Sequence, residues 1–295
     1  MIPYDYHRPE SLEEAIQLKK AIPDSLFISG GTDLMIRIKK NELRPHALIS
    51  LRSIPKLSGI ENGKRIRIGA MTSISDLTKN PWMHEKYPVL IQAALAMGNV
   101  QIRNVATIGG NLCNGSPAAD MAPPLLVLEA KVRLQEDRKK SKEISLEQFF
   151  LGPGKSCLTP GEILSHILLD PPQRDTKSIF LKKGRTRMDL AVASAAVLIR
   201  NDGERFLKAR VAAGSVAPTP LRLFAVESLL EGALFSQDLL KEAQRLACRS
   251  VSPITDIRST AEYRRHLVGV LVRRALEGLF AEDSGDKNYK GRDRP

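Results

Sequence analysis

The sequence is poor in cysteine and contains no long apolar run. Its three cysteines, Cys113, Cys157 and Cys248, are widely spaced, which argues against a disulfide framework and a C-x-x-C metal site and fits a reducing compartment. No apolar stretch approaches the ~20 residues of a membrane span. The N-terminal residues lack the charged-then-apolar layout of a secretory signal. We therefore expect a cytoplasmic protein without a membrane span.

Motifs for metal binding and for nucleophilic catalysis are missing as well. The 5 histidines are scattered, with no H-E-x-x-H and no pair at i and i+4, so the sequence predicts no metal site. No G-x-S-x-G and no clear pairing of a nucleophile with a base indicates hydrolysis. The sequence accordingly predicts no catalytic side chain.

Acidic residues and aromatic residues are both scarce in relation to the basic ones. The chain has 45 Lys and Arg against 33 Asp and Glu, a net charge of +12, while aromatic residues make up only 5%. A basic chain makes nucleic acid a candidate partner. However, the basic residues are spread over all 295 positions, and no helix-turn-helix, RRM or zinc-finger pattern occurs. We predict a solvated basic surface that attracts a dinucleotide or an acidic partner subunit, and no nucleic-acid binding.

Two glycine pairs stand out from this background. Gln101 to Asp120 reads QIRNVATIGGNLCNGSPAAD, and Leu26 to Leu34 reads LFISGGTDL, a strand-like run followed by Gly30-Gly31 and a Thr/Asp cap. Adjacent glycines allow φ > 0 and close approach to another molecule, and their backbone N–H groups can bind phosphate oxygens. Each pair alone could be an ordinary turn or cap. Two such loops together suit a long diphosphate ligand, although neither has the Rossmann or P-loop spacing.

Together the two stretches resemble the flavin-binding loops of the FAD-binding medium subunit of molybdenum hydroxylases, the xanthine dehydrogenase and carbon monoxide dehydrogenase family. The resemblance covers roughly residues 1 to 280 and includes FLKKGRTRMDLA at Phe180 to Ala191. It implies that the chain binds FAD, which we expect to be noncovalent. Some relatives hold an extra iron–sulfur cluster in this subunit, and no cysteine cluster here could ligate one.

The resemblance also implies individual contacts with the cofactor. Asp120 is expected at the adenosine ribose, Leu164 at the isoalloxazine and Lys182 at the flavin ring system, with Lys183 as the alternative lysine. On sequence alone, Asp120 could be a turn residue and Leu164 simply core. The complete expected set of cofactor-binding residues is Leu26, Phe27, Ile28, Ser29, Gly30, Gly31, Thr32, Asp33, Leu34, Met97, Gly98, Thr107, Ile108, Gly109, Gly110, Asn111, Asn114, Asp120, Leu164 and Lys182.

In such a family the organic chemistry belongs to the cofactors, and the protein supplies binding and orientation. The resemblance implies a molybdopterin-binding large subunit that oxidises the substrate and a small subunit with [2Fe–2S] clusters, assembled as a dimer of heterotrimers. This chain would pass electrons through FAD to a terminal acceptor. The alternatives are a stand-alone flavin-dependent oxidase with its own substrate pocket and a basic nucleic-acid-binding module.

The predicted fold class is α+β. We expect a two-lobed FAD-binding domain over residues 1–175, with a small α/β lobe (1–56) and a larger α+β lobe (57–175). A C-terminal α+β domain over residues 176–282 should contain a three-stranded antiparallel sheet backed by helices. The polar residues 283–295 are expected to be a disordered tail.

Three local patterns carry most of the element predictions. Ser11-x-x-Glu14 is a capping box and predicts a helix from Leu12 to about Lys20. Asn62-Gly63 lies between two short β runs and predicts a hairpin. Val127 to Leu134 alternates like a half-exposed strand.

Overall fold

The computed structural model describes residues 3–137 and 140–281, which form two compact units. Unit 1 combines residues up to 81 with 98–116 and 129–171, and unit 2 combines 82–97 and 117–128 with the residues from 172 onward. The expected disordered tail, 283–295, lies outside the described residues. The domain boundaries inferred from the sequence remain predictions.

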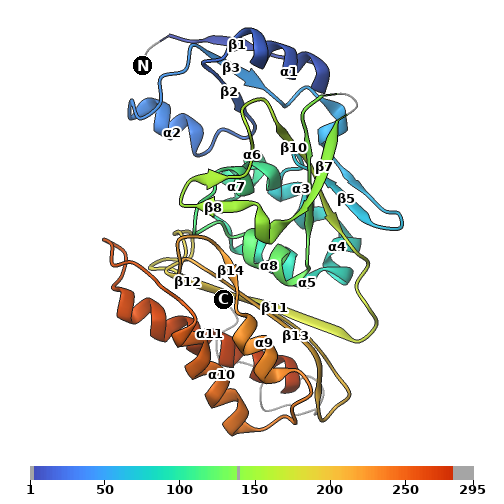
Figure 1. Ribbon diagram of the computed structural model, residues 1–295, viewed down its shortest axis with the longest axis vertical. Helices are drawn as coiled ribbons and strands as arrows, with labels where there is room; N and C mark the ends of the chain where they lie inside the picture. Colours follow the sequence, from blue (N-terminus) through green and yellow to red (C-terminus); the bar gives the residue numbers. More distant parts are fainter. Residues whose placement is uncertain (1–2, 138–139, 282–295) are drawn as a thin grey trace. The chain divides into compact units, whose positions relative to one another are not determined.

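A small parallel sheet opens unit 1 (Figure 1). Its strand order is β1-β3-β2, formed by β1 (Asp5–His7), β3 (Ala47–Ser50) and β2 (Ser25–Ile28). Helix α1 (Leu12–Ala21) buries Leu12, Ala15 and Ile16 with β3, while α2 (Leu34–Lys39) follows β2. The Ser11 cap is confirmed, because Ser11 Oγ accepts from Glu14 N at 3.1 Å. The reciprocal bond of the expected capping box is displaced by one residue, since Glu14 Oε2 accepts from Glu10 N at 2.9 Å rather than from Ser11 N.

A five-stranded antiparallel sheet forms the second half of unit 1. Its order is β4-β5-β10-β6-β7, built from β4 (Ile60–Glu61), β5 (Ile66–Gly69), β10 (Ile163–Leu169), β6 (Lys131–Gln135) and β7 (Ser141–Ser145). The expected hairpin is confirmed as β4 and β5, although Gly63 does not have a positive φ and the loop between the strands has four residues. The remaining elements of unit 1 are η1 (Pro55–Leu57), α3 (Ile74–Lys79), α6 (Val100–Val105), α7 (Ile108–Cys113), η2 (Leu146–Gln148), β8 (Phe150–Gly152) and β9 (Lys155–Ser156).

Unit 2 contains a four-stranded antiparallel sheet rather than the expected three strands. The order is β11-β12-β13-β14, formed by β11 (Thr176–Lys183), β12 (Ala193–Asn201), β13 (Phe206–Gly214) and β14 (Leu221–Arg222). The fourth strand was missed because two residues directly after Pro220 are too short to show a period of two. The helices assigned to the segments of unit 2 are α4 (Pro81–Lys86), α5 (Pro88–Ala96), α8 (Ala122–Val127), α9 (Phe224–Leu230), α10 (Gln237–Arg249) and α11 (Ala261–Ala281).

Helices cover both faces of this sheet (Figure 1). Alternate residues of β12, such as Ala195 and Val197, pack into a core shared with α9, α10 and α11. Ser194, between Ala193 and Ala195, lies on the opposite face, where a Cβ on Gly214 would lie 2.6 Å from Ser194 Oγ and 3.1 Å from Pro123 in α8. Helix α5 also packs against β11. Because both faces are covered, β12 is almost entirely buried.

The strand expected from Val127 to Leu134 is wrong in its first half. Val127 ends helix α8, Glu129 takes a left-handed φ of 53°, and β6 begins only at Lys131. The helix starts with Pro123 and Pro124 in its first turn, where proline is tolerated, and the alternation in sequence concealed it. None of the helices within the described residues, the 21-residue α11 included, is long and apolar enough to cross a membrane.

Candidate functional site

The first glycine loop, Ser29 to Asp33, joins β2 to α2 and leaves its backbone amides unpaired. Gly31 has a φ of +75°, which reverses the chain direction at little cost only for glycine. The N–H groups of Gly30, Gly31, Thr32 and Asp33 donate to no partner among the described residues. Four successive free donors therefore lie at the end of β2, as a phosphate-binding loop requires.

The second glycine loop differs from this expectation, because its amides are already used. Thr107 Oγ1 caps helix α7 by accepting from Gly110 N at 3.0 Å. Ile108 N donates to Thr72 O at 3.1 Å, and Gly109 N donates to Ala70 O at 2.9 Å. Asn111 N donates back to Thr107 O at 3.0 Å. The prediction that the backbone N–H groups of this loop are available to phosphate is therefore wrong. The helix was missed because two adjacent glycines have low helix propensity.

The structure nevertheless brings the two loops together. A Cβ on Gly110 would lie 2.6 Å from Ser29 Oγ, and a Cβ on Gly30 would lie 2.3 Å from Val105 O. Both glycines therefore permit the contact between the loops. The sequence interpretation placed Gly110 against a ligand, but the space beside it holds the hydroxyl groups of Ser29 and Thr107.

The other expected site residues of unit 1 are distributed between loops and core. Leu164 is only 3% exposed in β10, next to a register shift at Ser165. Gly98 has a φ of +49°, and its carbonyl accepts from Arg103 Nη1 at 3.0 Å. Several of the expected residues are buried, namely Ile28, Thr107, Ile108 and Gly109, whereas those that are partly exposed are Leu26, Phe27, Ser29, Gly30, Gly31, Thr32, Leu34, Gly110, Asn111 and Asn114.

In unit 2, Asp120 and Lys182 form a buried ion pair. Lys182 Nζ donates to Asp120 Oδ2 at 2.7 Å and to Ala96 O at 3.1 Å, and the two side chains are 5% (Asp120) and 7% (Lys182) exposed. Burial raises the pKa of Asp120, while the charge and hydrogen bond of Lys182 oppose the shift. Asp120 Oδ1 is buried and has no hydrogen-bond partner. Lys183, the alternative lysine, is exposed.

This pairing changes how Asp120 and Lys182 can act. The sequence interpretation assigned them to the ribose and to the ring system, but the bonded atoms are only 2.7 Å apart, so the two groups form one polar site rather than two separate ones. The free Oδ1 can accept a hydrogen bond from a ligand N–H or O–H, which would relieve the cost of an unpaired buried oxygen. Sequence reasoning missed Ala96, a backbone contributor at the end of α5 just before Met97, because no side-chain pattern marks it.

No group of three or more His, Cys, Asp and Glu side chains in the described part of the chain is arranged to hold a metal ion. Cys113, Cys157 and Cys248 are free thiols.

A loop of unpaired amides in an α+β fold is typical of proteins that bind a phosphate-containing ligand. Two family profiles cover nearly the whole chain. One, described as the FAD binding domain in molybdopterin dehydrogenase, matches residues 2–171. The other, the CO dehydrogenase flavoprotein C-terminal domain, matches residues 178–279.

Known proteins agree with the profiles over nearly their full length. The xanthine dehydrogenase FAD-binding subunit of Escherichia coli O157:H7 is 31% identical over 285 residues, covering 95% of this chain and 97% of that protein. The carbon monoxide dehydrogenase medium chain of Hydrogenophaga pseudoflava is 32% identical over 285 residues, covering 95% and 99%. A solved carbon monoxide dehydrogenase from the same organism matches with a TM-score of 0.91 at 33% identity, covering 95% of this chain and 99% of that chain.

The chain belongs to the family of FAD-binding subunits of molybdopterin dehydrogenases, as its sequence resemblance implied. It is an oxidoreductase subunit, and its cofactor is FAD. The residues fit this cofactor, because the unpaired amides of Gly30 to Asp33 supply the donors that a diphosphate needs.

Proposed function

We propose that this chain is the electron-transfer subunit of a three-component molybdenum hydroxylase. Electrons would arrive from [2Fe–2S] clusters on a small partner subunit and leave to a terminal acceptor, while a molybdopterin-binding large subunit oxidises the substrate. Bound FAD would supply the redox chemistry. The observation that carries the proposal is the loop of four unpaired amides in a chain similar over 95% of its length to carbon monoxide dehydrogenase medium chains.

The work of this chain's own residues is to bind and orient. The amides of Gly30 to Asp33 would hold the diphosphate without bringing a full charge, and the second loop would support them through Ser29 and Gly110. Asp120 and Lys182 would act as one polar contact, with the carboxylate accepting a hydrogen bond at Oδ1 and fixing the ammonium at Oδ2. The remaining expected residues, Leu26 to Ile28, Met97, Gly98, Asn111, Asn114 and Leu164 among them, would complete the contacts.

The proposal extends to organisation and assembly. A FAD-binding domain over 1–175 and a C-terminal domain over 176–282 are supported by the profile limits at 171 and 178. The assembly would be a dimer of heterotrimers, with the cytoplasm as its compartment.

Reconstitution tests the electron-transfer role. The isolated chain loaded with FAD should not be reduced by aldehyde or purine donors, and adding the two partner subunits should make the same donors bleach the flavin absorbance. Bleaching by such a donor in the isolated chain would instead favour a stand-alone oxidase. Acid treatment should release unmodified FAD, since we expect no covalent bond.

The ion pair can be tested without turnover. Asp120→Asn keeps the shape of the side chain but removes its charge, and Lys182→Met removes the ammonium, so both should weaken FAD binding measured by fluorescence titration. Lys183→Met is the matched control, because Lys183 is the exposed neighbour in the same strand. Equal FAD affinity in all three variants would contradict a role for the pair.

A further inference from the structure

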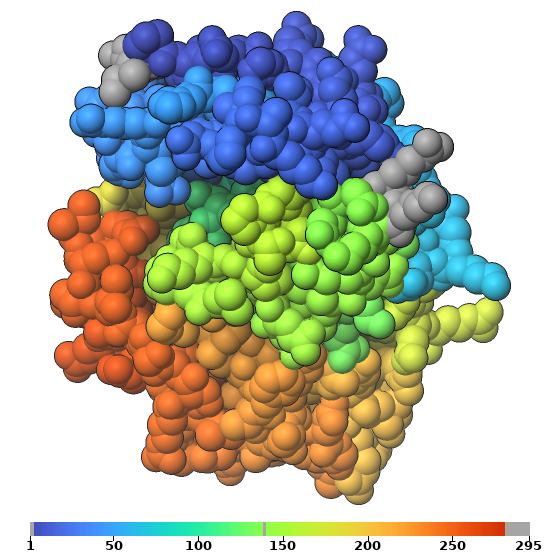
Figure 2. Space-filling model, turned by 45° about the horizontal axis from the view of Figure 1, so that its top comes forward, coloured from blue at the N-terminus to red at the C-terminus, as the bar shows by residue number. Residues whose placement is uncertain are grey.

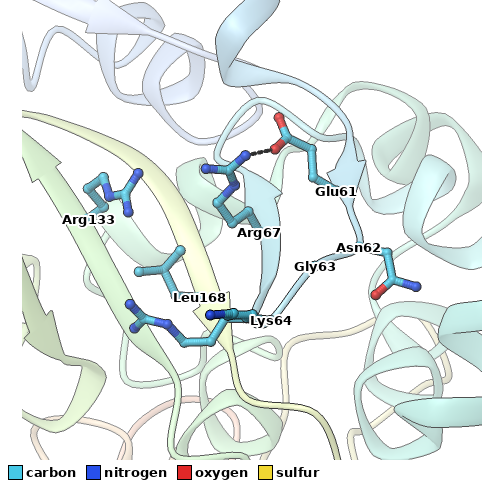
Figure 3. A pocket seen from close by; sticks show the side chains of 8 residues that line it. Glu61, Asn62, Gly63, Lys64, Arg67, Arg133 and Leu168 are labelled. Carbon is cyan, nitrogen blue, oxygen red and sulfur yellow. Dashed lines mark hydrogen bonds and ion pairs between the residues drawn. The ribbon is translucent and has the colours of Figure 1, made fainter.

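The outer face of the five-stranded sheet in unit 1 carries a hollow that the glycine loops do not use. Its volume is about 320 Å³, and its walls come from the β4–β5 turn, β5, β6 and β10. The turn projects from the surface, at the right edge of Figure 2 in cyan. The lining includes the apolar Leu168 and several charged side chains (Figure 3). The charged residues are Glu61, Lys64, Arg65, Arg67 and Arg133.

Strand register explains why arginines gather there. Arg67 of β5 pairs with Leu168 of β10, and two residues along β10, His166 pairs with Arg133 of β6. Side chains alternate between the faces of a strand, so these residues share the outer face while Ile66, Ile68 and Ile167 point into the core. Figure 3 shows Leu168 between Arg133 and Arg67.

The carboxylates in this array are already engaged. Glu61 accepts from Arg67, and Glu143 of β7 accepts from Arg133 Nη2 at 2.8 Å and from Arg65 Nη1 at 3.0 Å. A hydrogen bond from Arg133, and then one from Arg65, lowers the pKa of Glu143, so this carboxylate stays ionised and fixes both guanidinium groups. Each guanidinium has five N–H donors, and these bonds leave others available.

The charges do not balance. Lys64 and the three arginines stand against only two carboxylates, which leaves an excess of two positive charges around the hollow. His166 lies on the same face, and its pKa is lowered first by burial and then by the charges of Arg133 and Arg67. A site with oriented guanidinium groups and unbalanced positive charge favours an oxyanion, which such groups can bind through two hydrogen bonds at once.

We propose that this hollow binds a small oxyanion with two negative charges, of the phosphate or dicarboxylate type, at a site separate from the flavin loops. The volume is near the lower end of the ~300–1,000 Å³ usual for small-molecule sites, which suits a compact ligand. The hollow lies at the Arg65 end of β5, whereas the second glycine loop bonds to Ala70, beyond the other end of that strand. The two sites therefore lie at opposite ends of β5.

Calorimetric titration of the FAD-loaded protein with inorganic phosphate or succinate, at pH 8 and constant ionic strength, tests the proposal. FAD is kept bound because the free amides of Gly30 to Asp33 could themselves accept phosphate. We expect one saturable site, weakened about tenfold or more by Arg65→Gln or Arg133→Gln, the loss typical of one charge-assisted hydrogen bond. The tighter of the two ligands identifies the anion type.

Two further variants keep the result interpretable. Arg249→Gln removes the same charge from the exposed end of α10, so it should leave binding unchanged. Lys64→Gln, at the exposed turn, should weaken binding even if an arginine variant fails to fold, which FAD absorbance and the melting temperature will reveal. Lack of saturable binding would overturn the proposal. Weakening by Arg249→Gln equal to that by the arginine variants of the hollow would also overturn it, because the anion would then respond only to the net charge of +12.

Discussion

The two glycine loops of unit 1 share a Gly-Gly pair but use it for different purposes. In the first loop Gly31 takes a left-handed φ, Gly30 permits the close contact with Val105, and the amides stay unpaired. In the second loop the pair lies inside α7, where Gly109 is buried against Ala70 and the amides are bound within the protein. A glycine pair therefore marks a close approach of the backbone, but not whether the approaching group is a ligand or the chain itself.

Hydrogen exchange should show the largest contrast between the loops. Without FAD, the amides of Gly30 to Asp33 should exchange rapidly, since no acceptor protects them, and FAD should slow them. The amides of Ile108 to Asn111 should exchange slowly in both states. Mass spectrometry of peptides from each loop measures this. If FAD protects the second loop as strongly as the first, the distinction drawn between them is wrong.

Gly109→Ala should have the largest effect on the fold. A Cβ there would meet the Cβ of Ala70 at 2.5 Å and its carbonyl oxygen at 2.7 Å, an overlap that only a backbone shift can relieve. Overpacking of this kind costs about 1–3 kcal/mol of unfolding free energy, measured by denaturant titration of the FAD-free protein. Gly278→Ala is the control, because its Cβ in α11 meets nothing within 4 Å. An unchanged unfolding free energy in Gly109→Ala would show that the packing at Ala70 is looser than described.

Gly31→Ala should act mainly on the cofactor. Its φ of +75° would strain an alanine by roughly 1–2 kcal/mol, and relief of that strain would turn the free amides away from the diphosphate. FAD affinity, measured by fluorescence titration, should fall about tenfold, the equivalent of ~1.4 kcal/mol. Gly203→Ala, with a φ of +98° and open space around it, is the control, because it strains the turn between β12 and β13 of unit 2 and not a glycine loop of unit 1. Equal loss of FAD affinity in both variants would refute a direct role for the first loop.

Thr107→Ala should have the smallest effect, and on stability only. It removes the cap that accepts from Gly110 N, at a cost of about 1 kcal/mol, and Thr107→Ser should restore most of the loss. Ser73→Ala, which removes the equivalent cap of α3, provides a comparison in the melting temperature. If Thr107→Ala weakened FAD binding without lowering the melting temperature, the second loop would have to be regarded as a ligand loop.

The parts of the fold that were predictable are those coded by neighbouring residues. The cap at Ser11 lies within one turn of the group it binds, so a local pattern reveals it. Helix α7 was not visible, because two glycines have low helix propensity and packing against Ala70 overrides it. Strand β14 was too short to leave a pattern.

The candidate site shows the same limit. The glycine loops were found from sequence, but their different hydrogen bonding depends on Ala70 and Thr72, more than 30 residues before α7. Asp120 and Lys182 were selected separately by family resemblance. Their pairing across 62 positions is a tertiary contact that no spacing in the sequence encodes.

The alternation of segments between the two units has a consequence for how the molecule is made. Residues 82–97 and 117–128 belong to unit 2, and they supply α5 and α8, which pack against its sheet. On the ribosome both helices emerge before unit 1 is complete at residue 171, and tens of residues before the strands they cover. Gln92 accepts from the backbone of Phe180 at 2.7 Å, and Pro117 accepts from that of Ser215 at 2.8 Å, so early and late segments close unit 2 jointly. A gene divided between the two family segments would encode the sheet of unit 2 without the helices α5 and α8 that cover one of its faces.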